Sequence, residues 1–158
     1  MSTDESVLRA WAYLMRVAEP PHTGLRDLVE AEGPVAAAQA IRSRKVPAGF
    51  NGVLSVTNVR AEHDLSAQDL DAAAAVGARL VAPDDEEWPG WQLWGLRSAD
   101  TVERGGPPLA LWVRGSRCLA DEVAAGIGVI GSRASTSYGE HVTGQIVGEI
   151  GRASCRER

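Results

Sequence analysis

A short apolar run that stops at a small polar turn constrains this chain more than any other feature. The sequence reads Gly-Ile-Gly-Val-Ile over 126–130, then becomes small and polar over 131–139, and takes on a helical pattern over 140–150. A buried strand, a turn and a helix in this order indicate the opening βα unit of a parallel sheet. We therefore expect an α/β fold with a strand at 127–130 and a helix at 140–150.

The turn has the composition of a phosphate-binding site. Unpaired N–H groups and the dipole at a helix N-terminus attract anions, and the guanidinium of Arg133 matches the geometry of a phosphate. Gly131 lets the backbone approach a ligand closely, because it has no side chain. The sequence therefore predicts a phosphate-bearing ligand, bound by Gly131, Ser132, Arg133 and Thr136.

A literal dinucleotide motif overlaps this segment, but it is out of position. Residues 126–131 match Gly-x-Gly-x-x-Gly, whereas a dinucleotide site has its glycines in the turn after the strand. Here the expected strand occupies most of the motif, and Gly131 alone falls in the turn. We therefore predict no nucleotide cofactor at this position.

Groups suited to catalysis or metal binding do not cluster in the sequence. His22, His63 and His141 are far apart, and the serines of the turn lie outside a Gly-x-Ser-x-Gly elbow. The acidic run at 84–87 carries oxygen ligands of the kind that hard cations need, but adjacent carboxylates on a loop are more often solvated. We predict that the protein is not an enzyme, with no catalytic residue, no metal and no cofactor.

Composition limits the class of protein. A hydrophobic content of 44% in 158 residues supports a folded core, and a net charge of -5 argues against an indiscriminate nucleic-acid binder. No apolar run reaches the roughly 18 residues of a membrane span, and the acidic N-terminus is unlike a signal peptide. Because Cys118 and Cys155 make no disulfide framework, we expect a cytoplasmic protein with no membrane partner.

The first 60 residues indicate a small helical module, and mixed structure follows. Val7, Trp11 and Leu14 form a helical stripe. Gly33 suits the end of one helix and Pro34 the start of the next. Further elements are expected as helices at 25–32, 34–44 and 70–76, a loop at 46–53, and strands at 78–81 and 109–113. A capping box at Ser66 and Asp69 precedes the third of these helices.

Four segments in this order resemble the DNA-processing protein A family (DprA, also called Smf). They are Gly-Ala-Arg-Leu-Val at 77–81, Glu-Trp-Pro at 87–89, Pro-Leu-Ala-Leu-Trp-Val-Arg-Gly at 108–115 and Val-Ile-Gly-Ser-Arg-Ala-Ser-Thr-Ser-Tyr-Gly at 129–139. The family's Gly-Ser-Arg turn corresponds to residues 131–133, which the resemblance places in a DNA-binding pocket. The family's usual Tyr-Pro is replaced here by Trp88-Pro89.

The resemblance implies a helical SAM-like domain at 1–60 and, at 61–150, the opening part of an extended Rossmann-like domain with a parallel sheet. It also implies a recombination mediator without catalytic activity. Such a protein binds single-stranded DNA that enters during natural transformation (competence), protects it from nucleases and loads the RecA recombinase. The intact family protein is expected to be a homodimer, through an interface that this chain lacks.

The last residues depart from the family pattern. A Ser-Gly-x-Ala-x-Gly-Ile-Asp motif is expected after the final helix and a further strand, whereas residues 151–158 read Gly-Arg-Ala-Ser-Cys-Arg-Glu-Arg. We interpret them as an unrelated tail and the chain as a fragment. Two other hypotheses remain open. One is a Rossmann-like enzyme that binds a nucleotide or phosphoribosyl substrate, and the other is a structural α/β fragment in which Gly131 only permits a tight turn.

Overall fold

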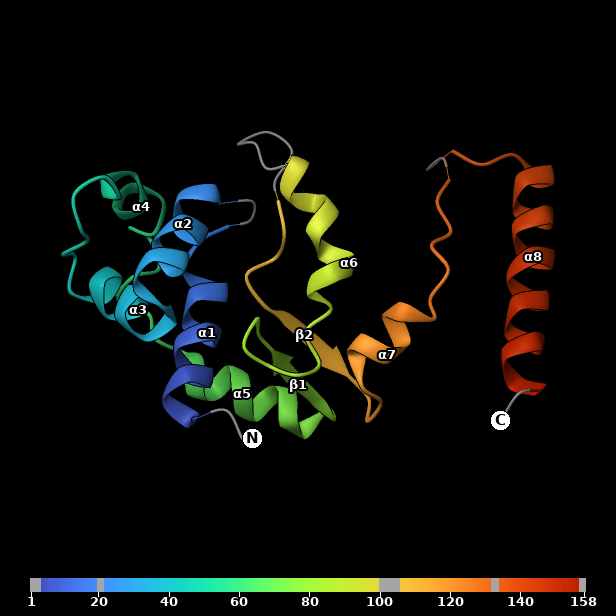
Figure 1. Cartoon of the computed structure of the whole chain (residues 1–158), viewed down its shortest axis with the longest axis horizontal. Helices are drawn as coiled ribbons and strands as arrows, with labels where there is room; N and C mark the ends of the chain where they lie inside the picture. Colours follow the sequence, from blue (N-terminus) through green and yellow to red (C-terminus); the bar gives the residue numbers. More distant parts are fainter. Residues whose placement is uncertain (1–3, 20–21, 100–105, 132–133, 157–158) are drawn as a thin grey trace. The chain divides into compact units, whose positions relative to one another are not determined.

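The computed structural model describes residues 4–19, 22–99, 106–131 and 134–156, which belong to two compact units divided between Ala125 and Gly126 (Figure 1). The first unit contains most of the elements, and the second contains one long helix. The elements of the first unit are α1 (Glu5–Val17), α2 (Thr23–Glu32), α3 (Pro34–Arg42), α4 (Asn51–Val56), α5 (Ser66–Ala75), β1 (Ala78–Val81), α6 (Gly90–Trp94), the 3-10 helix η1 (Gly95–Ala99), β2 (Leu111–Arg114) and α7 (Leu119–Ala124). The helix of the second unit is α8 (Ser137–Arg156).

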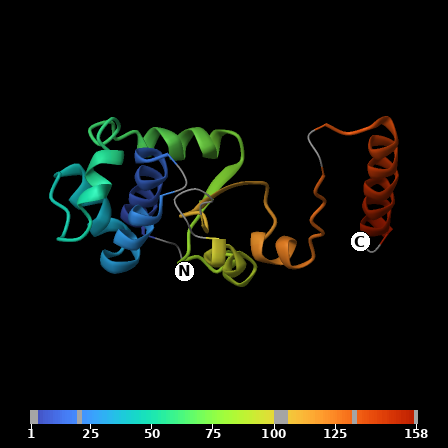
Figure 2. The same ribbon diagram turned by 90° about the horizontal axis from the view of Figure 1, so that it is seen from above.

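Helices α1, α2 and α3 pack around one apolar core. The predicted stripe of α1 faces inward, with Trp11 3% and Leu14 0% exposed. Leu28 of α2 and Ile41 of α3 are fully buried in the same core. Figures 1 and 2 show the three helices side by side. Burying one such aliphatic side chain contributes about 1.5–3 kcal/mol to the free energy of folding. Burial of these side chains therefore stabilises the packing of the three helices.

Glycine and proline set the boundaries of these helices as the sequence predicts. Gly33 adopts a φ of 79° after α2, and its N–H donates to the carbonyl oxygen of Val29. Pro34 then opens α3, because its missing N–H is not needed in a first turn. Gly77, with a φ of 68°, makes the turn between α5 and β1. Both glycines occupy the left-handed region, which other residues adopt only with strain.

The core of the first unit continues past residue 60. The hydroxyl of Tyr13 donates to the carbonyl oxygen of Ala61 at 2.8 Å, and Leu80 of β1 is buried with the helical residues. Arg16 of α1 donates to both carboxylate oxygens of Asp69 in α5, at 2.6 and 2.5 Å. Residues on both sides of position 60 therefore pack together, and a domain boundary at that position stays a prediction.

The two strands form an antiparallel sheet. Ala78 pairs with Arg114 and Val81 with Leu111, and α5 packs beside β1. The strand expected at 78–81 is confirmed, and the one expected at 109–113 lies at Leu111–Arg114. The fold is mixed and mostly helical. The described residues do not form the parallel sheet that the strand-turn-helix order predicts.

The strand expected at 127–130 is wrong for this structure. Residues 126–131 have no regular secondary structure, and the side chains that suggested burial are open to solvent. Ile127 is 69%, Val129 54% and Ile130 98% exposed. A strand exists through hydrogen bonds to a neighbouring strand, and the described residues of the second unit provide no second strand. Apolar composition alone is therefore insufficient here.

Several helices differ from expectation because their sequence signals are short. The loop expected at 46–53 is wrong from Asn51, where α4 begins, and α6 and α7 have no counterpart among the expected elements. Helices of five or six residues are too short to show a repeated apolar face. In contrast, α8 starts at Ser137 and continues through Gly151 to Arg156. A single glycine costs a helix only about 1 kcal/mol, so it need not end one.

Candidate functional site

The turn before α8 is described only in part. Ser132 and Arg133, two of the four predicted phosphate-binding residues, lie outside the described residues. Gly131 is described, and a Cβ added there meets no atom within 4 Å. Its φ is not in the left-handed region. Packing within the described chain therefore gives no reason for glycine at this position, and close approach of a ligand remains the prediction.

Thr136, the fourth predicted residue, caps the start of α8. Its Oγ1 accepts a hydrogen bond from the Gly139 N–H at 3.2 Å, and its carbonyl oxygen accepts from the Glu140 N–H at 3.0 Å. The N–H groups of Ser137 and Tyr138 precede these bonds and have no acceptor among the described residues. Such first-turn amides are available to an anion. Thr136 therefore shapes an exposed helix N-terminus.

An acidic side chain, which the sequence analysis missed, lies beside this N-terminus. The hydroxyl of Ser135 donates to Oε1 of Glu140 at 2.9 Å, so the carboxylate is held near the first turn of α8. Glu140, Gly131 and Thr136 line the same open hollow of about 710 Å³. A carboxylate here interacts favourably with the positive end of the helix dipole. It also repels the negative charge of a phosphate. The available signal was an acidic residue in the first turn of the expected helix.

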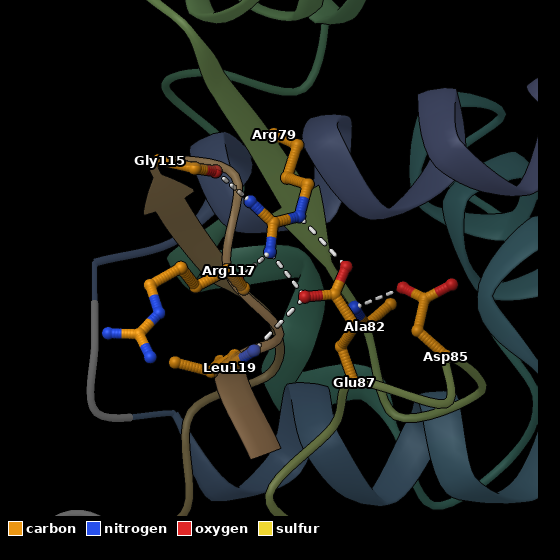
Figure 3. Close-up of polar contacts among 7 residues, drawn as sticks. All are labelled: Arg79, Ala82, Asp85, Glu87, Gly115, Arg117 and Leu119. Carbon is orange, nitrogen blue, oxygen red and sulfur yellow. Dashed lines mark hydrogen bonds and ion pairs between the residues drawn. The ribbon is translucent and has the colours of Figure 1, made fainter. Parts of the chain in front are cut away.

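A second polar cluster joins three of the segments that carry the family resemblance (Figure 3). Arg79 of β1 forms a two-pronged ion pair with Glu87, in which Nε donates to Oε1 at 2.8 Å and Nη2 donates to Oε2. The same guanidinium donates to the carbonyl oxygens of Gly115 and Arg117, the latter at 2.8 Å. The Leu119 N–H at the start of α7 donates to Glu87 Oε2 at 3.1 Å. Glu87 therefore ties the acidic loop to β1 and α7.

Charge pairing changes the titration of this cluster. The hydrogen bond from Arg79 holds the pKa of Glu87 below its ordinary value of 4.5, and the bond to Glu87 raises the pKa of Arg79. Asp85 accepts a hydrogen bond from the Ala82 N–H at 2.7 Å. The interpretation of the run 84–87 as simply solvated is therefore wrong for two of its four acids. Their role here is to hold loops, and the described residues contain no cluster of three metal-ligating side chains.

His22 has a structural role at the start of a helix. His22 caps α2, where its Nδ1 accepts a hydrogen bond from the Leu25 N–H at 3.1 Å. Burial lowers the pKa of His22, which favours the neutral ring that this cap requires.

No helix in the described part of the chain has the length and apolar character to cross a membrane.

Comparison with known proteins identifies two curated relatives, both from Mycobacterium tuberculosis. They come from strains CDC 1551 / Oshkosh and ATCC 25618 / H37Rv, and both carry the provisional name DNA processing protein DprA. Each is 41% identical to this chain over 140 residues, which cover 87% of the chain and 35% of the relative. The chain thus spans about a third of the length of these relatives. No family model and no solved structure matches it.

Proposed function

The resemblance to the DNA-processing protein A family is confirmed over 140 residues, and from this relationship we propose that the chain takes part in DNA processing as a non-catalytic protein that binds single-stranded DNA. The 41% identity to relatives named for DNA processing carries the proposal. The exposed N-terminus of α8 supports it, because amides at such a position suit a phosphate backbone.

The proposed mechanism is capture of a backbone phosphate at the turn before α8. The N–H groups of Ser137 and Tyr138 have no acceptor among the described residues and can donate to phosphate oxygens. Gly131, Ser132, Arg133 and Thr136 are the proposed binding residues around them. Because Glu140 brings a negative charge to the same hollow, the positive charge of Arg133 has to dominate. Such contacts give affinity for any base sequence.

The similarity to the DprA relatives also supports proposals about the fold, the localisation and the partners of the protein. We propose that 127–130 becomes a strand of a Rossmann-like parallel sheet when neighbouring strands are supplied, since its apolar side chains are 54–98% exposed at Ile127, Val129 and Ile130. We also propose that the helices of 1–60 form a SAM-like domain. We propose further that the protein is a cytoplasmic mediator that protects DNA in natural transformation. RecA is its proposed partner, and a second copy is the proposed partner of the intact protein.

Salt titration of oligonucleotide binding tests the phosphate site. Arg133→Ala is expected to weaken binding of the 158-residue chain to dT oligonucleotides and to oligonucleotides of mixed sequence. It should also flatten the dependence of affinity on salt by roughly one phosphate equivalent. Arg9→Ala is the matched control, because Arg9 is a half-exposed arginine paired with Glu5 in α1. A salt slope and affinity that Arg133→Ala leaves unchanged would contradict the site.

The titration also addresses the alternative of a nucleotide or phosphoribosyl enzyme. Such an enzyme binds one small ligand, so its affinity for oligonucleotides should not rise with the number of phosphates. The proposed mediator should bind longer strands more tightly and lose affinity steeply with salt.

A further inference from the structure

The first unit contains a pocket that the proposed phosphate site does not use. It is about 580 Å³ in volume and lies among α2, α3, α6, the acidic loop and the segment before β2. Its volume falls within the range of about 300–1,000 Å³ that small-molecule sites occupy. We call it the Trp94 pocket, lined among others by Trp88, Trp94, Arg26, Arg97, Glu30 and Asp84.

One wall of the Trp94 pocket is an accessible aromatic face. Trp94 is 63% exposed, although tryptophan is usually well buried. The guanidinium of Arg97 lies over its ring, 5.3 Å from the centroid. A planar cation therefore already lies near this indole. Trp91, on the same helix, is 84% exposed but does not line the pocket.

The charges of the ionised side chains that line the pocket sum to zero. Arg26 and Arg97 contribute two positive charges, and Glu30 and Asp84 contribute two negative ones. Arg97 pairs with Glu30 at 2.9 Å, with both side chains about half exposed. Arg26 is buried, and its Nη2 donates to the carbonyl oxygen of Pro107 at 2.9 Å, which fixes that wall. A ligand is therefore held through ring contacts more than through net charge.

We propose that the Trp94 pocket accepts an unpaired base of single-stranded DNA, which stacks on Trp94 in place of the Arg97 guanidinium. The proposal rests on the proposed function and extends it to a second contact on the first unit. Every base offers a flat π-face that stacks on aromatic side chains without sequence preference. The exposed pair of Arg97 and Glu30 is weakly held, so a base can displace it.

Two ligands with the same number of phosphates separate this base site from the phosphate site. The full chain is titrated with a fluorescent dT oligonucleotide and with an abasic oligonucleotide of equal length. Trp94→Ala is expected to weaken dT binding about tenfold, as loss of one stacked base does. It should leave abasic binding and the salt slope unchanged. Arg133→Ala, in contrast, should weaken both ligands and flatten the slope.

Two further variants control the comparison. Trp91→Ala removes a more exposed tryptophan of the same helix, outside the pocket, and should leave dT affinity unchanged. Trp94→Phe keeps an aromatic ring and should restore most of the affinity. Circular dichroism should show the same helix content in all variants, since Trp94 is largely outside the core.

The outcomes distinguish the two proposals. Normal dT affinity in Trp94→Ala would overturn the base site and leave the phosphate site standing, and the exposed aromatic face would then belong to a protein partner. Equal losses for dT and abasic strands, or equal losses in Trp91→Ala and Trp94→Ala, would also overturn it. A wild-type chain that binds neither oligonucleotide would overturn both proposals.

Discussion

The two units of the chain differ in the burial of their apolar residues. In the first unit Leu14, Leu28 and Ile41 are completely buried among helices. In the second unit none of the described side chains is buried, and Ile130 is 98% exposed. The run at 126–130, Gly-Ile-Gly-Val-Ile, has three large apolar side chains. Apolar residues therefore form a core only where other elements lie close enough to cover them.

The polar groups show the same contrast. In the first unit Tyr13, Arg16 and Arg79 each join segments far apart in the sequence. In the second unit the hydrogen bonds of Ser135 and Thr136 join residues three to five positions apart. Long-range contacts make folding cooperative, whereas local ones leave a segment free to open by itself. We therefore expect the first unit to hold most of the chain's stability.

Leu14→Ala should produce the largest effect on this comparison. The substitution leaves a cavity in the core of the first unit, and we expect a loss of about 2–5 kcal/mol in the free energy of unfolding. Urea denaturation followed by tryptophan fluorescence measures it. The matched control is Val59→Ala, because Val59 is 81% exposed and its truncation should cost less than about 0.5 kcal/mol. Similar losses in both variants would contradict a core centred on α1.

Glu87→Gln should have a smaller effect that depends on pH. The change removes the charge that pairs with Arg79, and we expect a loss of about 1 kcal/mol at pH 7. The folded pKa of Glu87 lies below 4.5, so its contribution is complete above that pH and is lost as pH falls through the folded value. Denaturation at several pH values between 3 and 7 checks both points. If the variant loses stability on acidification as steeply as the wild type, the ion pair does not contribute.

The parts of the fold that the sequence predicts are those with strong local signals. The stripe of Trp11 and Leu14, the Gly33–Pro34 junction and the turn at Gly77 all depend on residues close together in the chain. The strand at 127–130 fails because a strand depends on distant partners, which local composition does not reveal.

The residues of the candidate sites also differ in how well the sequence predicts them. Thr136 caps α8 at Ser137, three residues before the expected start at 140, although a threonine before a helical pattern is a common cap. The pairing of Glu87 with Arg79 and Leu119 was missed, since no spacing rule links an acidic loop to a strand and a later helix. The Trp94 pocket was missed because its walls come from segments far apart in the sequence. Ser132 and Arg133 lie outside the described residues, so their roles stay predictions.

Hydrogen exchange on the purified 158-residue chain tests the central claim most directly, which is that the first unit is folded around its own core and the second is not. We expect slow exchange at the amides of α1, α2 and α3, close to the limit set by global unfolding. Amides of 126–131 and of α8 should exchange much faster, because none of the described side chains there is buried. Strong protection across both units, lost in a single cooperative step in a monomer, would contradict the account.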